Sequence, residues 1–137
     1  MHKLVTYLSQ TGHTARLAEC LADAMDADLY ELELLLWQWD PLGAYDRIYL
    51  GFPLPGGEVP GLIRTILGSG LFRGKRILPF SAAPGCDMEK VRAVLQSSCP
   101  EAEILPGAVF PADASLADLA GWAEHTDQLL RHTEAPR

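Results

Sequence analysis

The sequence predicts an α/β three-layer sandwich, in which helices cover both faces of a five-stranded parallel sheet. Three observations lead to this prediction. Short apolar, β-branched runs alternate along the chain with longer stretches whose apolar residues recur every three or four positions. Clusters of turn-forming residues separate the two kinds of segment. The chain has 137 residues, of which 48% are hydrophobic and 21% charged, so it provides one core and no second domain.

The first half of the chain supplies three strands and two helices. The first strand is predicted over residues 3–8, and a helix with a single apolar stripe follows over residues 15–25. Residues 29–36 form the second strand, where alternating glutamates indicate a sheet edge with one wet face. The third strand covers residues 46–52. Pro60 suits the first turn of the next helix, whose predicted buried side comprises Leu62, Ile63, Ile66 and Leu67.

The second half continues the alternation. A fourth strand is predicted over residues 75–80 and a fifth over residues 104–110, where Pro106 favours an edge position or a bulge because it has no N–H to donate. The predicted buried side of the helix between them comprises Met88, Val91, Val94 and Leu95. That of the last helix comprises Leu116, Leu119, Ala120, Ala123 and Leu130.

One connection is too short for the pattern. Only about eleven residues, 35–45, are available to connect the second and third strands, close to the minimum for a parallel crossover, so the helix there is expected to be shortened or missing. Trp37 and Trp39 lie in this connection and are expected to cover exposed sheet or to form a homodimer contact; stacking on a ligand is the alternative. Residues 1–131 are expected to form a single domain, and residues 132–137 a loose tail.

Charge and cysteine content restrict the partners and the compartment. A net charge of -7 would repel nucleic acid and anionic membranes and would attract a basic protein. Cys20, Cys86 and Cys99 contain no CxxC pair and do not form a disulfide framework, which favours a reducing cytoplasm. The N-terminal apolar run is too short for a signal peptide or a membrane span.

Three loops should meet where the parallel strands end, which is where ligands bind in open α/β sheets. They are residues 9–14, 53–58 and 82–87, all rich in glycine, proline and small residues. The first combines three hydroxyls with a glycine and the free amides of a helix N-terminus, but contains no lysine or arginine. These donors suit a phosphate monoester rather than a nucleoside triphosphate, and an ordinary helix cap is the alternative.

The segment Ser9-Gln-Thr-Gly-His-Thr14 resembles the phosphate-binding loop of flavodoxins, with His13 in place of the usual asparagine. Residues 45–53 resemble the third strand and flavin-side loop of that family, and residues 72–80 resemble its fourth strand. The resemblance spans nearly the whole chain. It implies a flavodoxin-like strand order of 2-1-3-4-5, FMN as cofactor, and one- or two-electron transfer.

The resemblance also assigns roles to the three loops. The FMN phosphate would be held by Ser9, Gln10, Thr11, Gly12, His13 and Thr14. The isoalloxazine ring would be flanked by Pro53, Leu54, Pro55, Gly56 and Gly57, and by Ala82, Ala83, Pro84, Gly85 and Cys86. In the family, a flexible peptide in the second loop rotates toward the flavin, which glycine makes sterically easy; a tight turn before a helix is the alternative.

Two side chains in these loops have further interpretations. His13 is either a phosphate neighbour or a solvent-facing residue of the first helical turn. Cys86 is either a reactive thiol at a helix N-terminus or a buried small side chain. Neither flanking loop contains the aromatic ring that flavodoxins usually stack on the flavin, and each lost stack is expected to weaken binding by about one to two decades.

The sequence therefore predicts an electron carrier that binds FMN noncovalently and exchanges electrons with a basic redox protein. Direct FMN-dependent reduction of a small acceptor remains open. The alternative is a degenerate flavodoxin fold that serves as a binding or interaction module with weak or no flavin binding. No metal-ligand set, dinucleotide fingerprint, receiver-type aspartate or serine-hydrolase elbow is present in the sequence.

Overall fold

The computed structural model describes residues 3–8, 12–32, 45–82, 85–111 and 113–133, with side chains described as far as residue 130. Its strands are β1 (Lys3–Tyr7), β2 (Asp28–Glu31), β3 (Arg47–Gly51), β4 (Arg76–Ser81), β5 (Glu103–Ile104) and β6 (Ala108–Val109). Its helices are α1 (Gly12–Met25), α3 (Gly61–Gly68), α4 (Met88–Ser98) and α5 (Leu116–Thr133), with a 3-10 turn η1 (Pro55–Gly57).

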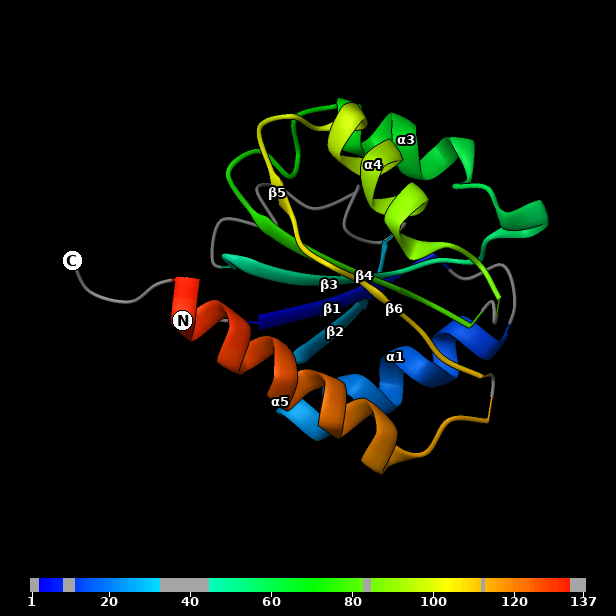
Figure 1. Cartoon of the computed structure of the whole chain (residues 1–137), viewed down its shortest axis with the longest axis vertical. Helices are drawn as coiled ribbons and strands as arrows, with labels where there is room; N and C mark the ends of the chain where they lie inside the picture. The colour runs from blue at the N-terminus through cyan, green and yellow to red at the C-terminus, as the bar shows by residue number, and fades with distance from the viewer. Residues whose placement is uncertain (1–2, 9–11, 33–44, 83–84, 112, 134–137) are drawn as a thin grey trace.

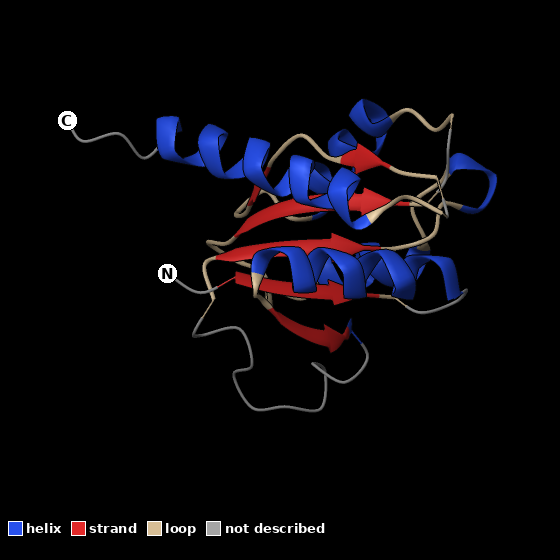
Figure 2. Ribbon diagram, turned by 90° about the horizontal axis from the view of Figure 1, so that it is seen from below, coloured by secondary structure: helices blue, strands red, loops and turns tan. Residues whose placement is uncertain are grey.

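All strand pairs are parallel, as Figure 2 shows by the common direction of the arrows. The strand order is β2-β1-β3-β4-β5, with β6 also paired to β4. Helices α1 and α5 lie on one face of the sheet, and α3 and α4 lie on the other (Figure 1). The three-layer α/β architecture and the order 2-1-3-4-5 are confirmed.

Each face of the sheet has its own apolar core, because successive side chains of a strand point to opposite faces. Leu4, Ile48 and Ile77 pack on the α3 and α4 side, whereas Val5 and Leu78 pack on the other. An aromatic group forms part of the second core: the ring of Trp122 meets three other rings edge-on, at centroid distances of 5.4, 6.1 and 5.6 Å, from Tyr49, Phe80 and Phe110.

The second strand is shorter than the sequence suggested. Residues 29–36 were expected to be extended, but β2 ends at Glu31 and the buried Leu32 is already helical. The neighbouring strand explains the difference, since Tyr7, the last residue of β1, pairs with Glu31. Trp37, Trp39 and the rest of residues 33–44 lie outside the described residues.

The predicted fifth strand is divided into β5 and β6. The amides of Leu105 and Phe110 donate to the carbonyl oxygens of Ile77 (2.8 Å) and Ser81 (2.9 Å). Pro79 lies midway between these two acceptors and faces the segment that joins β5 to β6, but it has no N–H to donate to that segment. The facing segment contains Pro106, which also lacks an N–H. Two missing donors therefore interrupt the ladder. The edge position that Pro106 indicated is confirmed, because β5 and β6 lie beyond β4 at the edge of the sheet.

Three predicted core positions are exposed instead. Leu62, Val94 and Leu116 are 43%, 36% and 49% exposed, respectively. Each lies at the border of its helix's apolar stripe, and the sheet buries only the centre of that stripe, such as Ile63 in α3 and Leu95 in α4. Helix α5 continues to Thr133, two residues into the segment that was expected to be a loose tail.

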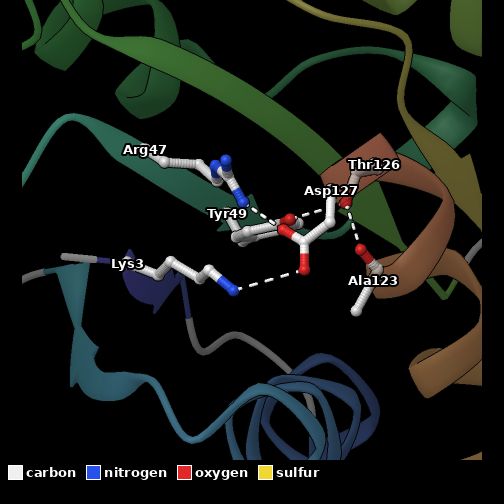
Figure 3. Close-up of polar contacts among 6 residues, drawn as sticks. All are labelled: Lys3, Arg47, Tyr49, Ala123, Thr126 and Asp127. Carbon is white, nitrogen blue, oxygen red and sulfur yellow. Dashed lines mark hydrogen bonds and ion pairs between the residues drawn. The ribbon is translucent and has the colours of Figure 1, made fainter. Parts of the chain in front are cut away.

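A polar network closes the amino-terminal end of the sheet (Figure 3). The carboxylate of Asp127 on α5 pairs with Arg47, the buried first residue of β3, and with Lys3 (3.4 Å), the first residue of β1. The hydroxyl of Thr126 lies 2.6 Å from the hydroxyl of Tyr49 and donates to the carbonyl oxygen of Ala123 (2.9 Å). The network fastens α5 to the end of the sheet opposite the three loops.

The hydrogen bond between Tyr45 and Asp28 makes the stability of the protein depend on pH in the alkaline range. Burial and the hydrogen bond and charge of Asp28 raise the pKa of Tyr45 from 10.0 to about 12, and its hydroxyl donates to that carboxylate at 2.5 Å. Between pH 10 and 12 the unfolded chain loses this proton before the folded chain does, so the free energy of unfolding should fall as pH rises through that window.

The variant Tyr45→Phe should make that decline smaller, as measured by urea unfolding from pH 8 to 12. Some decline should persist, because burial also raises the pKa of Tyr49. Tyr30→Phe, which changes an exposed ring on β2, is the comparison variant. It should keep most of the decline, because Tyr30 is the smallest of the causes that raise the pKa of Tyr45. If stability depended on pH identically in wild type and Tyr45→Phe, Tyr45 would not contribute to the decline.

Candidate functional site

The three loops leave the sheet side by side. Tyr7, Gly51 and Phe80 are register partners near the carboxyl ends of β1, β3 and β4. Backbone pairing continues to the start of the loops: Leu8 N–H donates to the Gly51 carbonyl oxygen (2.9 Å), and Phe52 N–H to that of Phe80 (3.3 Å). Because the chain passes from β1 to β2 on one side and to β3 on the other, the loops begin at the point where the strand order reverses.

The first loop leads directly into α1. Helix α1 begins at Gly12, His13 is exposed and Thr14 is buried; Ser9, Gln10 and Thr11 lie outside the described residues. The first turn of α1 contains no acidic side chain, although the chain carries 18 Asp and Glu residues. The positive end of the helix dipole is therefore not offset by a carboxylate in that turn, and the site suits an anion.

The second loop is a tight, exposed turn. Gly57 N–H donates to the Leu54 carbonyl oxygen (2.9 Å), and Glu58 N–H to that of Pro55 (3.2 Å). Gly56 and Gly57 have φ angles of +65° and +81°, and a Cβ at either would meet nothing within 4 Å. Conformation rather than lack of space therefore favours glycine at both positions. The tight turn proposed from the sequence is present, and its two glycines are open to a ligand.

The third loop ends in a capped helix. Gly85 is exposed with a φ of +86°, and the Asp87 carboxylate accepts a hydrogen bond from Glu89 N–H (3.0 Å) at the start of α4. Cys86 is partly buried and packs against the core on the α3 and α4 side, whereas Ala83 and Pro84 lie outside the described residues.

Two aromatic rings at the carboxyl ends of the described strands belong to the core. Phe52 and Phe80 are fully buried, and a Cβ at Gly51 would lie 2.5 Å from Cζ of Phe80, so the glycine makes room for that ring. Neither ring is available at the surface for stacking. A flat ligand would instead be held through the backbone and small side chains of the second and third loops.

Ser81 is a residue of this region that sequence reasoning missed. It is the last residue of β4, directly before the third loop, and its hydroxyl is fully buried with no hydrogen-bond partner in the described part of the chain. The sequence signal for it was a polar residue directly after the apolar run of the fourth predicted strand. Buried hydroxyls are usually satisfied, so Ser81 is a polar group still able to bond beneath the loop.

Comparison with known proteins identifies the family. A family model described as flavodoxin matches residues 38–126. The chain belongs to the flavodoxin family. The matched segment includes the second and third loops but not residues 9–14, so the assignment does not depend on the predicted phosphate loop. No curated protein matches the sequence.

Solved structures agree with this fold. A candidate flavoprotein from Bacteroides uniformis ATCC 8492 is 27% identical, with a TM-score of 0.75 over 90% of this flavodoxin and 97% of that chain. A flavoprotein from Lactobacillus acidophilus NCFM in complex with FMN is 18% identical (TM-score 0.64, 89% and 98% covered). Oxidised flavodoxin 2 from Bacillus cereus is 19% identical (TM-score 0.61, 90% and 96% covered).

Two kinds of feature are absent from the described residues of this flavodoxin. No three His, Cys, Asp or Glu side chains gather as a metal site within the described residues. No helix among them has the length and apolar character to cross a bilayer. The arrangement at the strand ends suits an anion at the N-terminus of α1, with two glycine-containing loops beginning beside it.

Proposed function

We propose that this flavodoxin binds FMN noncovalently and carries electrons. The observation that supports this most is that three loops begin side by side at the strand-order reversal, next to a helix N-terminus whose first turn has no acidic side chain. The FMN complex of the Lactobacillus acidophilus relative, which shares the fold, is consistent with it. When bound, FMN supplies one- or two-electron redox chemistry, and the protein supplies binding and orientation.

Each loop has a separate task in this proposal. Residues 9–14 and the free amides of α1 bind the phosphate, with the Thr14 hydroxyl as one donor. Residues 53–57 and 82–86 flank the ring. The buried hydroxyl of Ser81 supports this fit, because a polar ligand atom would give it a partner.

The electron partner is proposed to be a protein with a basic face. The net charge of -7 supports this, because opposite charges speed diffusional encounter. A homodimer formed through Trp37 and Trp39 is a separate proposal that light scattering tests. An unchanged monomeric mass for the wild type and for the Trp37→Ser, Trp39→Ser double variant would exclude it.

FMN titration tests the cofactor proposal. Adding protein should quench FMN fluorescence with saturation, and riboflavin, which lacks the phosphate, should bind at least about tenfold more weakly. No quenching at high protein concentration would refute FMN binding. The lack of an aromatic residue in residues 53–58 and 82–87 would then favour a binding module that has lost flavin.

The variant Thr14→Val isolates the phosphate contact. It keeps the shape of a buried side chain but removes one donor to a dianion, so the Kd for FMN should rise about tenfold while riboflavin binding stays unchanged. Thr65→Val, at an exposed position on α3, is the matched control and should leave both affinities unchanged. An equal loss of FMN and riboflavin affinity would place Thr14 away from the phosphate.

A further inference from the structure

A pocket of about 270 Å³ lies between α3 and α4, next to the η1 turn. Figure 1 shows these two helices together on one face of the sheet. Three valines give the pocket its apolar lining: Val59, Val91 and Val94. Val94 was expected in the core but is 36% exposed, because it faces this pocket. Removing an apolar ligand from water into such a lining is favourable.

The pocket also carries two cationic side chains, Arg64 from α3 and Lys90 from the first turn of α4. The chain has more acidic than basic residues, 18 against 11, so a basic side chain has many potential partners. Yet neither Arg64 nor Lys90 has an ion pair or a hydrogen bond in the described part of the chain.

The other described basic side chains all have partners. Five of them pair with carboxylates: Lys3, Arg47, Arg73, Arg76 and Arg92. The other two, Arg16 and Lys75, donate to backbone carbonyl oxygens. The two described basic residues without a partner thus line the same pocket. Glu58 also lines it but pairs with neither, so the charged lining sums to +1 on a protein of net charge -7.

We propose that this pocket binds a small amphipathic organic anion. Its apolar body would pack on the three valines, and its carboxylate or sulfonate would be held by Arg64 and Lys90. Charge-assisted hydrogen bonds from both side chains to the anion would replace the hydrogen bonds that these exposed groups make with water. The pocket is near the lower limit of ligand-binding cavities, which favours a molecule of one or two rings.

This inference does not depend on the flavin. The pocket and the proposed ring-flanking turn share Gly57, so an occupant would lie against the turn without using the phosphate loop. Binding of the anion can therefore be measured in the protein without cofactor.

Isothermal titration calorimetry with 2-naphthoate tests the proposal, with neutral 2-naphthalenemethanol as the comparison ligand. We expect saturable 1:1 binding of the naphthoate and at least about fivefold weaker binding of the neutral compound. The Arg64→Gln, Lys90→Gln double variant should bind naphthoate about tenfold more weakly. Raising the salt concentration should weaken binding to the wild type, because both cations are exposed.

Two further variants control this experiment. Arg73→Gln, Arg76→Gln removes the same number of charges outside the pocket and should leave the affinity within about twofold of wild type. Val94→Asp places a carboxylate in the pocket at an exposed position and should abolish binding. Absence of saturable binding at millimolar naphthoate, or equal affinities in the two double variants, would overturn the proposal. FMN titration of the same samples shows separately whether the cofactor proposal holds.

Discussion

Replacing Gly107 with alanine is expected to lower the free energy of unfolding by about 3 kcal/mol. A Cβ at this position would lie 2.4 Å from the carbonyl oxygen of Pro79 and 2.8 Å from its Cγ. The Met88 methyl group, at 2.7 Å, can move aside because its side chain is flexible. The Pro79 carbonyl cannot, because it belongs to β4 in the middle of the sheet. The segment between β5 and β6 would have to move away from β4.

Gly121→Ala is the matched control for this substitution. Gly121 lies within α5, and a Cβ there would meet nothing within 4 Å. Alanine should therefore stabilise the protein by about 0.5 to 1 kcal/mol, because it favours the helix. Urea unfolding followed by circular dichroism measures both changes. If Gly107→Ala did not lower the free energy of unfolding relative to wild type, the close approach of Gly107 to β4 would not be a determinant of stability.

The order of the elements could be predicted because it depends on local patterns. The predicted runs at residues 3–8, 46–52 and 75–80 correspond to β1, β3 and β4, and their apolar, β-branched composition needs no knowledge of neighbours. Parallel connections then require helices on both faces. The position of the three loops also follows, since the carboxyl ends of parallel strands share one edge.

The ends of the edge strands could not be predicted, because they depend on pairing. Pro106 alone indicated an edge or a bulge, but the division into β5 and β6 also needs Pro79 in the facing position of β4. Likewise β2 ends at Glu31 because β1 offers no further partner beyond Tyr7. Neither fact is visible until the register is known.

The pocket between α3 and α4 also lies beyond sequence reasoning. Arg64 and Lys90 come from different helices, and each looks like an ordinary exposed charge in its own segment. What distinguishes them is that the other described basic residues have partners, which is a property of the folded chain. Helical periodicity placed Val94 in the core for the same reason, because it cannot show where two helices leave a gap.

Replacing Asp127 with asparagine should lower the free energy of unfolding by about 3 kcal/mol, because it leaves a buried arginine without its carboxylate. The side chain of Arg47 is only 5% exposed, and that of Asp127 is 27% exposed. Asparagine keeps the size of the side chain, so the loss measures the charge rather than packing. The Lys3 ion pair to the same carboxylate would be lost as well. Thermal unfolding should shift downward by roughly 6 to 12 °C.

An exposed ion pair provides the control that separates burial from charge. Arg73 and Glu101 approach to 2.9 Å, closer than Lys3 and Asp127, but their side chains are 68% and 54% exposed. Water and salt screen such a pair, so Glu101→Gln should cost no more than about 0.5 kcal/mol. If a short distance alone determined the strength of an ion pair, both Asp127→Asn and Glu101→Gln would lose substantial stability. If the burial of Arg47 determines it, only Asp127→Asn should do so. Equal, small losses would mean that Arg47 keeps its charge satisfied without Asp127, and that α5 is held to the sheet by its apolar side chains.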